Sequence, residues 1–165
     1  MPSNEPLIWH ALSVRQPYAE LIVRGIKRYE ARTWEPRWLG GAILIHASQS
    51  LAAGWRGNKW ILAGLKRAGI LPEDVPTLSR SALIGAVDVV GFLNATRYAR
   101  KVVPVFQRRL CYTSDPDGDF LLWKLRNAVA FERPIRSDGK LGLWSVSQRV
   151  TRLVDARLPE FDIQA

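Results

Sequence analysis

Short apolar runs rich in β-branched residues constrain the fold of this chain most strongly. The clearest run, residues 82–93, is apolar apart from Asp88, and its Gly85 and Gly91 suggest bulges or a close approach of another segment. Similar but shorter runs lie at residues 11–14, 42–46, 120–125 and 141–146. They lack the regular alternation with crossover helices that builds a parallel sheet. The sequence therefore predicts an α+β fold, a small and mostly antiparallel β-barrel decorated with helices.

Three segments have helical character. Residues 17–24 begin with Pro17, which suits a first helical turn, and end before Gly25. Residues 49–70 carry an apolar stripe, with Gly54 and Gly57 expected to break the helix near its start. Residues 147–157 are predicted to form a last helix. Between these elements, residues 71–81 and 93–118 are predicted to be connections, and Pro134 is predicted to precede a turn at 137–139.

The length of 165 residues fits a single domain with modest extensions. We expect a loose leader at residues 1–9, the domain at 10–147, and a C-terminal extension at 148–165 that packs on the domain or trails from it. The start of the chain lacks the charged and apolar regions of a secretory signal, and no apolar run is long enough to span a bilayer. With one cysteine, the chain has no intramolecular disulfide, and a cytoplasmic location is expected.

The charge balance indicates an anionic partner. Lys and Arg number 24 against 15 Asp and Glu, which gives a net charge of +9. Residues 93–114 contain no acid and interleave aromatic residues with five cations, a composition that suits a surface tracking a nucleic-acid backbone. A solvated basic loop is the alternative interpretation. The five cations are Arg97, Arg100, Lys101, Arg108 and Arg109. Of the seven tryptophans, Trp123 and Trp144 fall in predicted strands, where core packing is their expected role.

The segment GIKRYEAR at residues 25–32 is the most informative candidate site. Lys27 follows a helix end, and Glu30 and Arg32 lie two residues apart in a predicted strand, so their side chains share one face. Such a group can bind a phosphate or a base. The alternative is a structural Glu–Arg pair at a barrel mouth.

Two further groups of polar residues are candidates. Ser13, Arg15 and Gln16 precede the first helix and could form an anion-binding mouth, although a plain strand-to-helix turn fits equally well. His46 and Ser48 end a predicted strand, but no nucleophile-elbow sequence surrounds Ser48, so a structural histidine is the better interpretation. The histidines and the cysteine have no metal-ligand spacing, and we expect no metal or cofactor.

Several segments together resemble the ASCH domain, the activating signal cointegrator homology family. They are ALSVRQPYA at 11–19, GIKRYEAR at 25–32, GAILIHAS at 41–48, LIGAV at 83–87, and residues 120–127 and 139–144. The resemblance implies a PUA-like β-barrel that binds RNA or another nucleic acid. It also implies a cleft beside the first helix that uses Ser13, Gln16, Lys27, Glu30 and Arg32, with His46 and Ser48 near its floor.

The leading hypothesis is a single-domain nucleic-acid-binding protein, with RNA as the favoured partner and DNA as the alternative partner. Phosphates would contact Lys27, Arg32, Arg15 and the 97–109 segment. The first alternative is a hydrolase of single-stranded RNA or of a modified nucleoside, with Lys27 and Glu30 catalytic. A related branch hydrolyses acetylated cytidine with a Lys and a Thr three residues later; Glu30 occupies that Thr position here, which speaks against amidohydrolase activity. The second alternative is a protein-interaction module in transcription.

Overall fold

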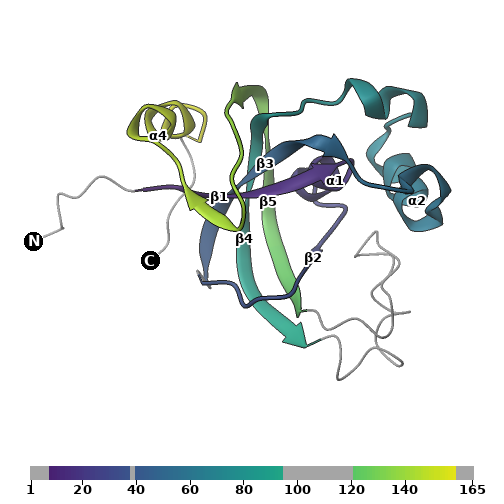
Figure 1. Cartoon of the computed structure of the whole chain (residues 1–165), viewed down its shortest axis with the longest axis horizontal. Helices are drawn as coiled ribbons and strands as arrows, with labels where there is room; N and C mark the ends of the chain where they lie inside the picture. The colour runs from purple at the N-terminus through teal and green to yellow at the C-terminus, as the bar shows by residue number, and fades with distance from the viewer. Residues whose placement is uncertain (1–7, 38–39, 95–120, 159–165) are drawn as a thin grey trace, which may run out of the picture.

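The computed structural model describes residues 8–37, 40–94 and 121–158 (Figure 1). A six-stranded sheet forms the body of the molecule. Three α-helices lie around the sheet in the described residues: α1 (Tyr18–Val23), α2 (Lys59–Ala68) and α4 (Gln148–Asp155). The strands are β1 (His10–Gln16), β2 (Tyr29–Arg32), β3 (Gly41–Leu51), β4 (Ala82–Asn94), β5 (Leu121–Arg136) and β6 (Leu143–Ser145).

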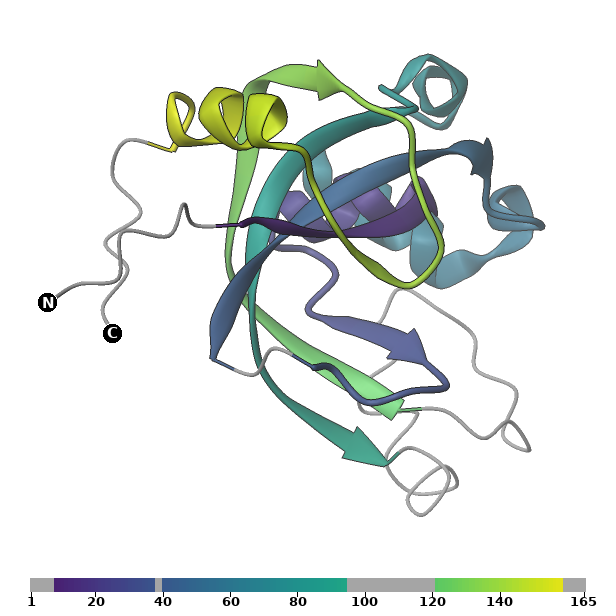
Figure 2. The same cartoon turned by 60° about the vertical axis from the view of Figure 1, so that its left-hand side comes forward.

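The strand order is β2-β5-β4-β3-β1-β6, and only the β1–β3 pair is parallel. The predicted α+β class with mostly antiparallel pairing is therefore confirmed. In the parallel pair, α1 and β2 provide the connection between β1 and β3. Figure 2 shows the long strands β3, β4 and β5 curving strongly, so that the sheet is barrel-like. The described strands form no backbone ladder between β2 and β1, and the sheet is not closed.

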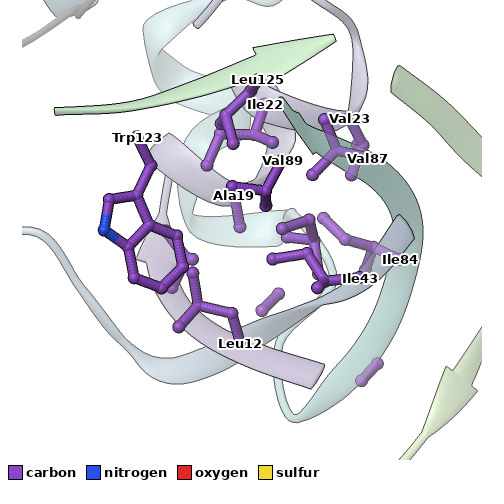
Figure 3. Close-up of a cluster of buried hydrophobic side chains, with 14 residues drawn as sticks. Leu12, Ala19, Ile22, Val23, Ile43, Ile84, Val87, Val89, Trp123 and Leu125 are labelled. Atoms are coloured by element: carbon purple, nitrogen blue, oxygen red, sulfur yellow. The ribbon is translucent and has the colours of Figure 1, made fainter. Parts of the chain in front are cut away.

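The central core fills the concave side of this curved sheet. Ala19, Ile22 and Val23 of α1 pack there against strand residues such as Val87 and Trp123 (Figure 3). Gly85 on β4 makes the close approach of α1 possible, because a Cβ at this position would overlap the Val129 carbonyl oxygen and lie 2.6 Å from Val23 Cγ1.

Residues 82–87 of strand β4 are buried on both faces, which explains their continuous apolar sequence. Ile84, Val87 and Val89 belong to the central core, whereas Leu83 and Ala86 belong to a second cluster with α4. That second cluster also contains Trp9, whose indole Nε1 donates to Asp155 Oδ1 at 2.8 Å. Trp9, the last residue of the stretch predicted to be a leader, is thus part of the packed structure.

A third cluster covers the outer side of α1. Leu21 packs there with Ile61 and Leu65 of α2, with Trp55 from a 3₁₀ helix (Trp55–Gly57), and with Val75 from a second 3₁₀ helix (Pro72–Thr77). In Figure 1, α4 with the second cluster and α2 with the third cluster lie at opposite ends of the sheet.

Two predicted elements were wrong in extent. The helix expected at 49–70 begins only at Lys59, because β3 continues to Leu51 and Asn58 Oδ1 caps the helix by accepting from the backbone N–H of Trp60 and Ile61. Strand β5 runs to Arg136, well past the predicted end at 125. Pro134 is accommodated inside this strand because the β4–β5 register shifts between Leu83 and Gly85, and proline is tolerated at such irregularities.

Candidate functional site

Lys27, Glu30 and Arg32 form one ionic network at β2. Arg32 donates from Nε to Glu30 Oε1 at 3.1 Å, and Lys27 Nζ lies 3.6 Å from Glu30 Oε2. The predicted common face of Glu30 and Arg32 is therefore confirmed. The antiparallel register pairs Glu30 with Trp123, and directly paired residues share a face of the sheet. Because Trp123 belongs to the central core, the network lies at the edge of the barrel interior.

Lys27 is almost fully buried, and its ammonium is held within the protein. Nζ donates to the backbone oxygen of Tyr29 at 2.6 Å and lies 5.1 Å from the centroid of the Tyr18 ring. The turn after α1 places it there, since the backbone N–H groups of Ile26 and Lys27 both donate to Leu21 O. Attraction to the Glu30 carboxylate offsets part of the cost of removing this cation from water.

Arg32 connects β2 to β1 across the open side of the sheet. Its Nη2 lies 3.0 Å from Glu30 Oε1 and donates to the backbone oxygen of Ser13, also at 3.0 Å. Ser13 lies just beyond the last β1–β6 pair, Leu12 with Leu143, so its carbonyl is available to the guanidinium. The Arg32 side chain remains 23% exposed, whereas the Glu30 side chain is 10% exposed.

Ser13 and His46 are register partners on the parallel strands β1 and β3, and together they hold residues 137–142 against the sheet. Because a carbonyl oxygen only accepts, His46 Nε2–H donates to Ser137 O at 2.7 Å. His46 Nδ1 lies 3.2 Å from Ser13 Oγ, which donates to Lys140 O at 3.0 Å and accepts from Trp144 Nε1 at 3.2 Å. Burial lowers the pKa of His46 below its ordinary value of 6.5, against the opposing effects of the Ser137 hydrogen bond and the Asp138 charge.

Gln16 and Arg15 have different surroundings although they are adjacent. The Gln16 side chain is buried, accepts at Oε1 from the Glu20 backbone N–H at 2.9 Å, and donates from Nε2 to Ser79 O at 2.9 Å. Both ends of its amide are thus engaged in fixing α1 and the loop before β4. Arg15, in contrast, is exposed.

The structure divides the predicted site residues: Lys27 lines one pocket, Ser13, His46 and Ser48 line another, and Arg15, Gln16, Glu30 and Arg32 line neither of the two. The first, called the arginine pocket here, has a volume of about 480 Å³ and contains Lys27 together with Arg28, Arg126 and Asn127. The second, called the serine pocket, has a volume of about 440 Å³ and contains Ser13, His46 and Ser48 together with Ser81, Asp138 and Lys140. These two sets of lining residues do not overlap, and the Lys27–Glu30–Arg32–Ser13 contacts connect them.

Sequence reasoning missed Arg126 and Asn127 in the first pocket and Asp138 and Lys140 in the second. The pair at 126–127 belongs to no motif in the sequence. In the structure, Asn127 has a positive φ of 53° inside β5. The turn at 137–139 was predicted, but its position over Ser13 and His46 depends on tertiary packing. The predicted basic cations Arg97, Arg100, Lys101, Arg108 and Arg109 lie outside the described residues.

Within the described parts of the chain, no three His, Cys, Asp or Glu side chains group closely enough to hold a metal ion. No helix in these same parts has the length and apolar character needed to cross a membrane.

Comparison with known proteins assigns the family. The family model of the ASCH domain matches residues 12–134, most of the chain. The chain belongs to the ASCH domain family. This family is associated with RNA binding. The resemblance noted in the sequence, and the fold that it implies, are thereby confirmed.

Individual relatives agree with this assignment. The human protein "Activating signal cointegrator 1" is 26% identical over 145 residues, which cover 84% of this chain and 22% of that protein. The crystal structure of ASCH from Zymomonas mobilis covers 89% of this chain and 93% of its own, with a TM-score of 0.55 at 16% identity. Its S128A mutant gives a TM-score of 0.56 at 15% identity, covering 89% and 94%. At these identities the solved structures show the shared fold alone.

Proposed function

We propose that this ASCH domain binds RNA at the arginine pocket, with the exposed Arg28 and Arg126 contacting phosphates and the Lys27–Glu30–Arg32 network beside them. Family membership supports the partner class, and the net charge of +9 supports electrostatic attraction to a polyanion. The arginine pocket is the single observation that carries the proposal to particular residues.

The lining of the arginine pocket contains three cations and no acid. Arg28 and Arg126 are exposed, and the stem of the buried Lys27 contributes to the wall. Asp88, whose register partner is Arg126, is engaged at Oδ2 by Asn127 Nδ2 at 2.7 Å. Two arginines that face solvent beside a recess of this size are suited to bind neighbouring phosphates of one strand.

The buried network has a different role from the exposed arginines in this proposal. Lys27 and Glu30 balance each other's charge inside the protein, and Lys27 lines the arginine pocket whereas Glu30 does not. Arg32 is held by Glu30 and by Ser13 O but keeps an exposed surface, so it can contact a phosphate outside the pocket. Arg15, exposed at the end of β1, adds further charge outside the pocket.

Fluorescence anisotropy with a labelled single-stranded RNA, from 50 to 300 mM KCl, tests the proposal. We expect the logarithm of the affinity to fall linearly with the logarithm of the salt concentration, by about 0.7 for each phosphate contact. The double variant Arg28→Gln, Arg126→Gln should reduce this slope by about 1.4 and weaken binding. Its control is Arg149→Gln, Arg152→Gln, which makes the same charge change on the exposed face of α4.

Two results would contradict the proposal in different ways. Binding that does not depend on salt, or no binding, would exclude a phosphate-directed RNA-binding function. Equal effects of the two double variants would show that the total charge attracts RNA and that the arginine pocket plays no special part.

A further inference from the structure

The serine pocket carries polar groups that the proposed phosphate contacts do not use. Ser13 and His46 line it, but their polar atoms are engaged with each other, with Trp144 and with backbone oxygens of residues 137 and 140. The groups that remain for a ligand are the side chains of Ser48, Ser81, Asp138 and Lys140. A volume of about 440 Å³ lies within the range of small-ligand sites.

The segment that carries Asp138 and Lys140 is fixed at several points. Ser137 O accepts from His46, Lys140 O accepts from Ser13, and the Ser137 backbone N–H donates to Ser81 O at 3.0 Å. Between them, Gly139 packs so closely that a Cβ would lie 2.7 Å from His46 Nδ1 and 2.8 Å from Ser13 Oγ. Two charged side chains of opposite sign are therefore displayed on a backbone that is already ordered, which lowers the entropic cost of binding.

Two further features distinguish this pocket from its surroundings. Ser48 Oγ is buried and has no hydrogen-bond partner in the described residues, whereas such groups are normally satisfied. Ser81 has a φ of 51°, a left-handed conformation that is strained for a residue other than glycine. Strained and unsatisfied groups that gather in one pocket are typical of binding sites.

The side-chain chemistry selects one nucleobase. A carboxylate such as that of Asp138 accepts two hydrogen bonds side by side, and guanine alone offers two adjacent donors, N1–H and the N2 amino group, on its Watson–Crick edge. Cytosine and adenine offer a donor beside an acceptor, and uracil offers one donor between two acceptors. Lys140, two residues from Asp138, supplies the donor that guanine O6 or N7 accepts. Leu141, 98% exposed at the pocket, offers an apolar surface for the face of the base.

We propose that the serine pocket binds a guanine base, presented by a single-stranded RNA whose phosphates contact the arginines. This inference rests on the RNA-binding function proposed above. The Asp138 carboxylate accepts hydrogen bonds from N1–H and from the N2 amino group, and Lys140 donates to O6 or N7. Ser48, after rotation of its hydroxyl, contributes to orienting the base.

The test compares labelled eight-nucleotide RNAs in anisotropy titrations with the full chain. One RNA is all uridine, and the others carry a single central G, A or C. The G-containing RNA should bind about tenfold more tightly than the others. Asp138→Asn should remove this preference, because an amide presents a donor beside an acceptor. Asp74→Asn, which makes the same charge change at an exposed residue outside the pocket lining, should leave the preference intact.

The outcomes separate the inference from the function on which it rests. If all RNAs bind with the expected salt dependence but without preference for G, the guanine site is wrong and RNA binding stands. A parallel NMR titration with GMP and UMP identifies the source of the base. Binding of GMP to the wild type but not to Asp138→Asn, without binding of any RNA, would retain the guanine site and refute RNA as its source. Failure of both GMP and RNA to bind would overturn both proposals.

Discussion

The ion pair Glu30–Arg32 should contribute more to the free energy of unfolding than the exposed pair Glu20–Arg24, although the charged atoms of the exposed pair lie closer together. We expect Arg32→Met to lower the free energy of unfolding by about 3 kcal/mol, since it removes contacts to Glu30 and to Ser13 O and leaves a mostly buried carboxylate with Lys27 alone at 3.6 Å. Glu30→Gln should cost about 2 kcal/mol. In the double variant no unpaired carboxylate remains, so its cost should be smaller than the sum by about 1–2 kcal/mol.

The chain provides its own control in Glu20–Arg24. This i,i+4 pair is closer, at 2.8 Å, than the 3.0 Å of Glu30–Arg32, but the Arg24 side chain is 44% exposed. Exposed helical pairs of this kind have coupling energies of about 0.3–0.5 kcal/mol. If burial rather than distance determines the coupling, the double-mutant cycle at Glu30–Arg32 must give the larger value.

Urea unfolding, monitored by tryptophan fluorescence, measures these free energies. Trp123 is a suitable probe because it is buried and in edge-to-face contact with Trp34. Far-ultraviolet circular dichroism should give the same transition, which is required for the free energies to be comparable. A coupling energy at Glu30–Arg32 no larger than at Glu20–Arg24 would refute the argument that this network is stabilised by its buried position.

Two further predictions concern stability. The pKa of His46 is lowered in the folded protein, so as the pH falls the unfolded chain binds a proton at this histidine before the folded protein does. The free energy of unfolding should therefore fall as the pH drops below 6.5. It should level off once His46 of the folded protein is also protonated. His46→Asn should remove this contribution in urea titrations across that range, and an identical pH profile for the variant would contradict the assignment. Gly85→Ala should cost at least about 2 kcal/mol, because its Cβ meets backbone and Val23, whereas Gly91→Ala, with Lys124 Cδ at 3.8 Å, should change stability by less than about 1 kcal/mol. Equal thermal shifts for the two alanine variants would refute the packing argument.

The parts of the fold that the sequence predicted are those with local causes. The apolar run at 82–93 matches β4 (Ala82–Asn94), because burial of residues 82–87 on both faces leaves no polar alternation there. The shared face of Glu30 and Arg32 follows from the two-residue period of a strand. The helix predicted at 49–70 starts too early, because Asn58, a residue type that favours the N-cap position, fixes the start of α2 at Lys59.

The parts that the sequence did not predict depend on register between distant strands. Ser13 and His46 are 33 residues apart, and they meet because β1 pairs with β3 in parallel at this register. Residue types in two strands do not determine which residue faces which when both strands are apolar. For the same reason the sequence predicted one cleft, whereas Lys27 lines one pocket and Ser13, His46 and Ser48 line another.

The Arg32–Ser13 contact also has a mechanical consequence. Neighbouring strands elsewhere in the sheet are joined by ladders of backbone hydrogen bonds, which salt hardly affects, whereas β2 and β1 are joined in the described residues by a side chain that carries charge. Polyanions and salt compete for a guanidinium but not for a backbone ladder. The separation of β1 and β2 should therefore depend on the concentration of salt or polyanion, whereas the strands joined by backbone ladders should keep their spacing.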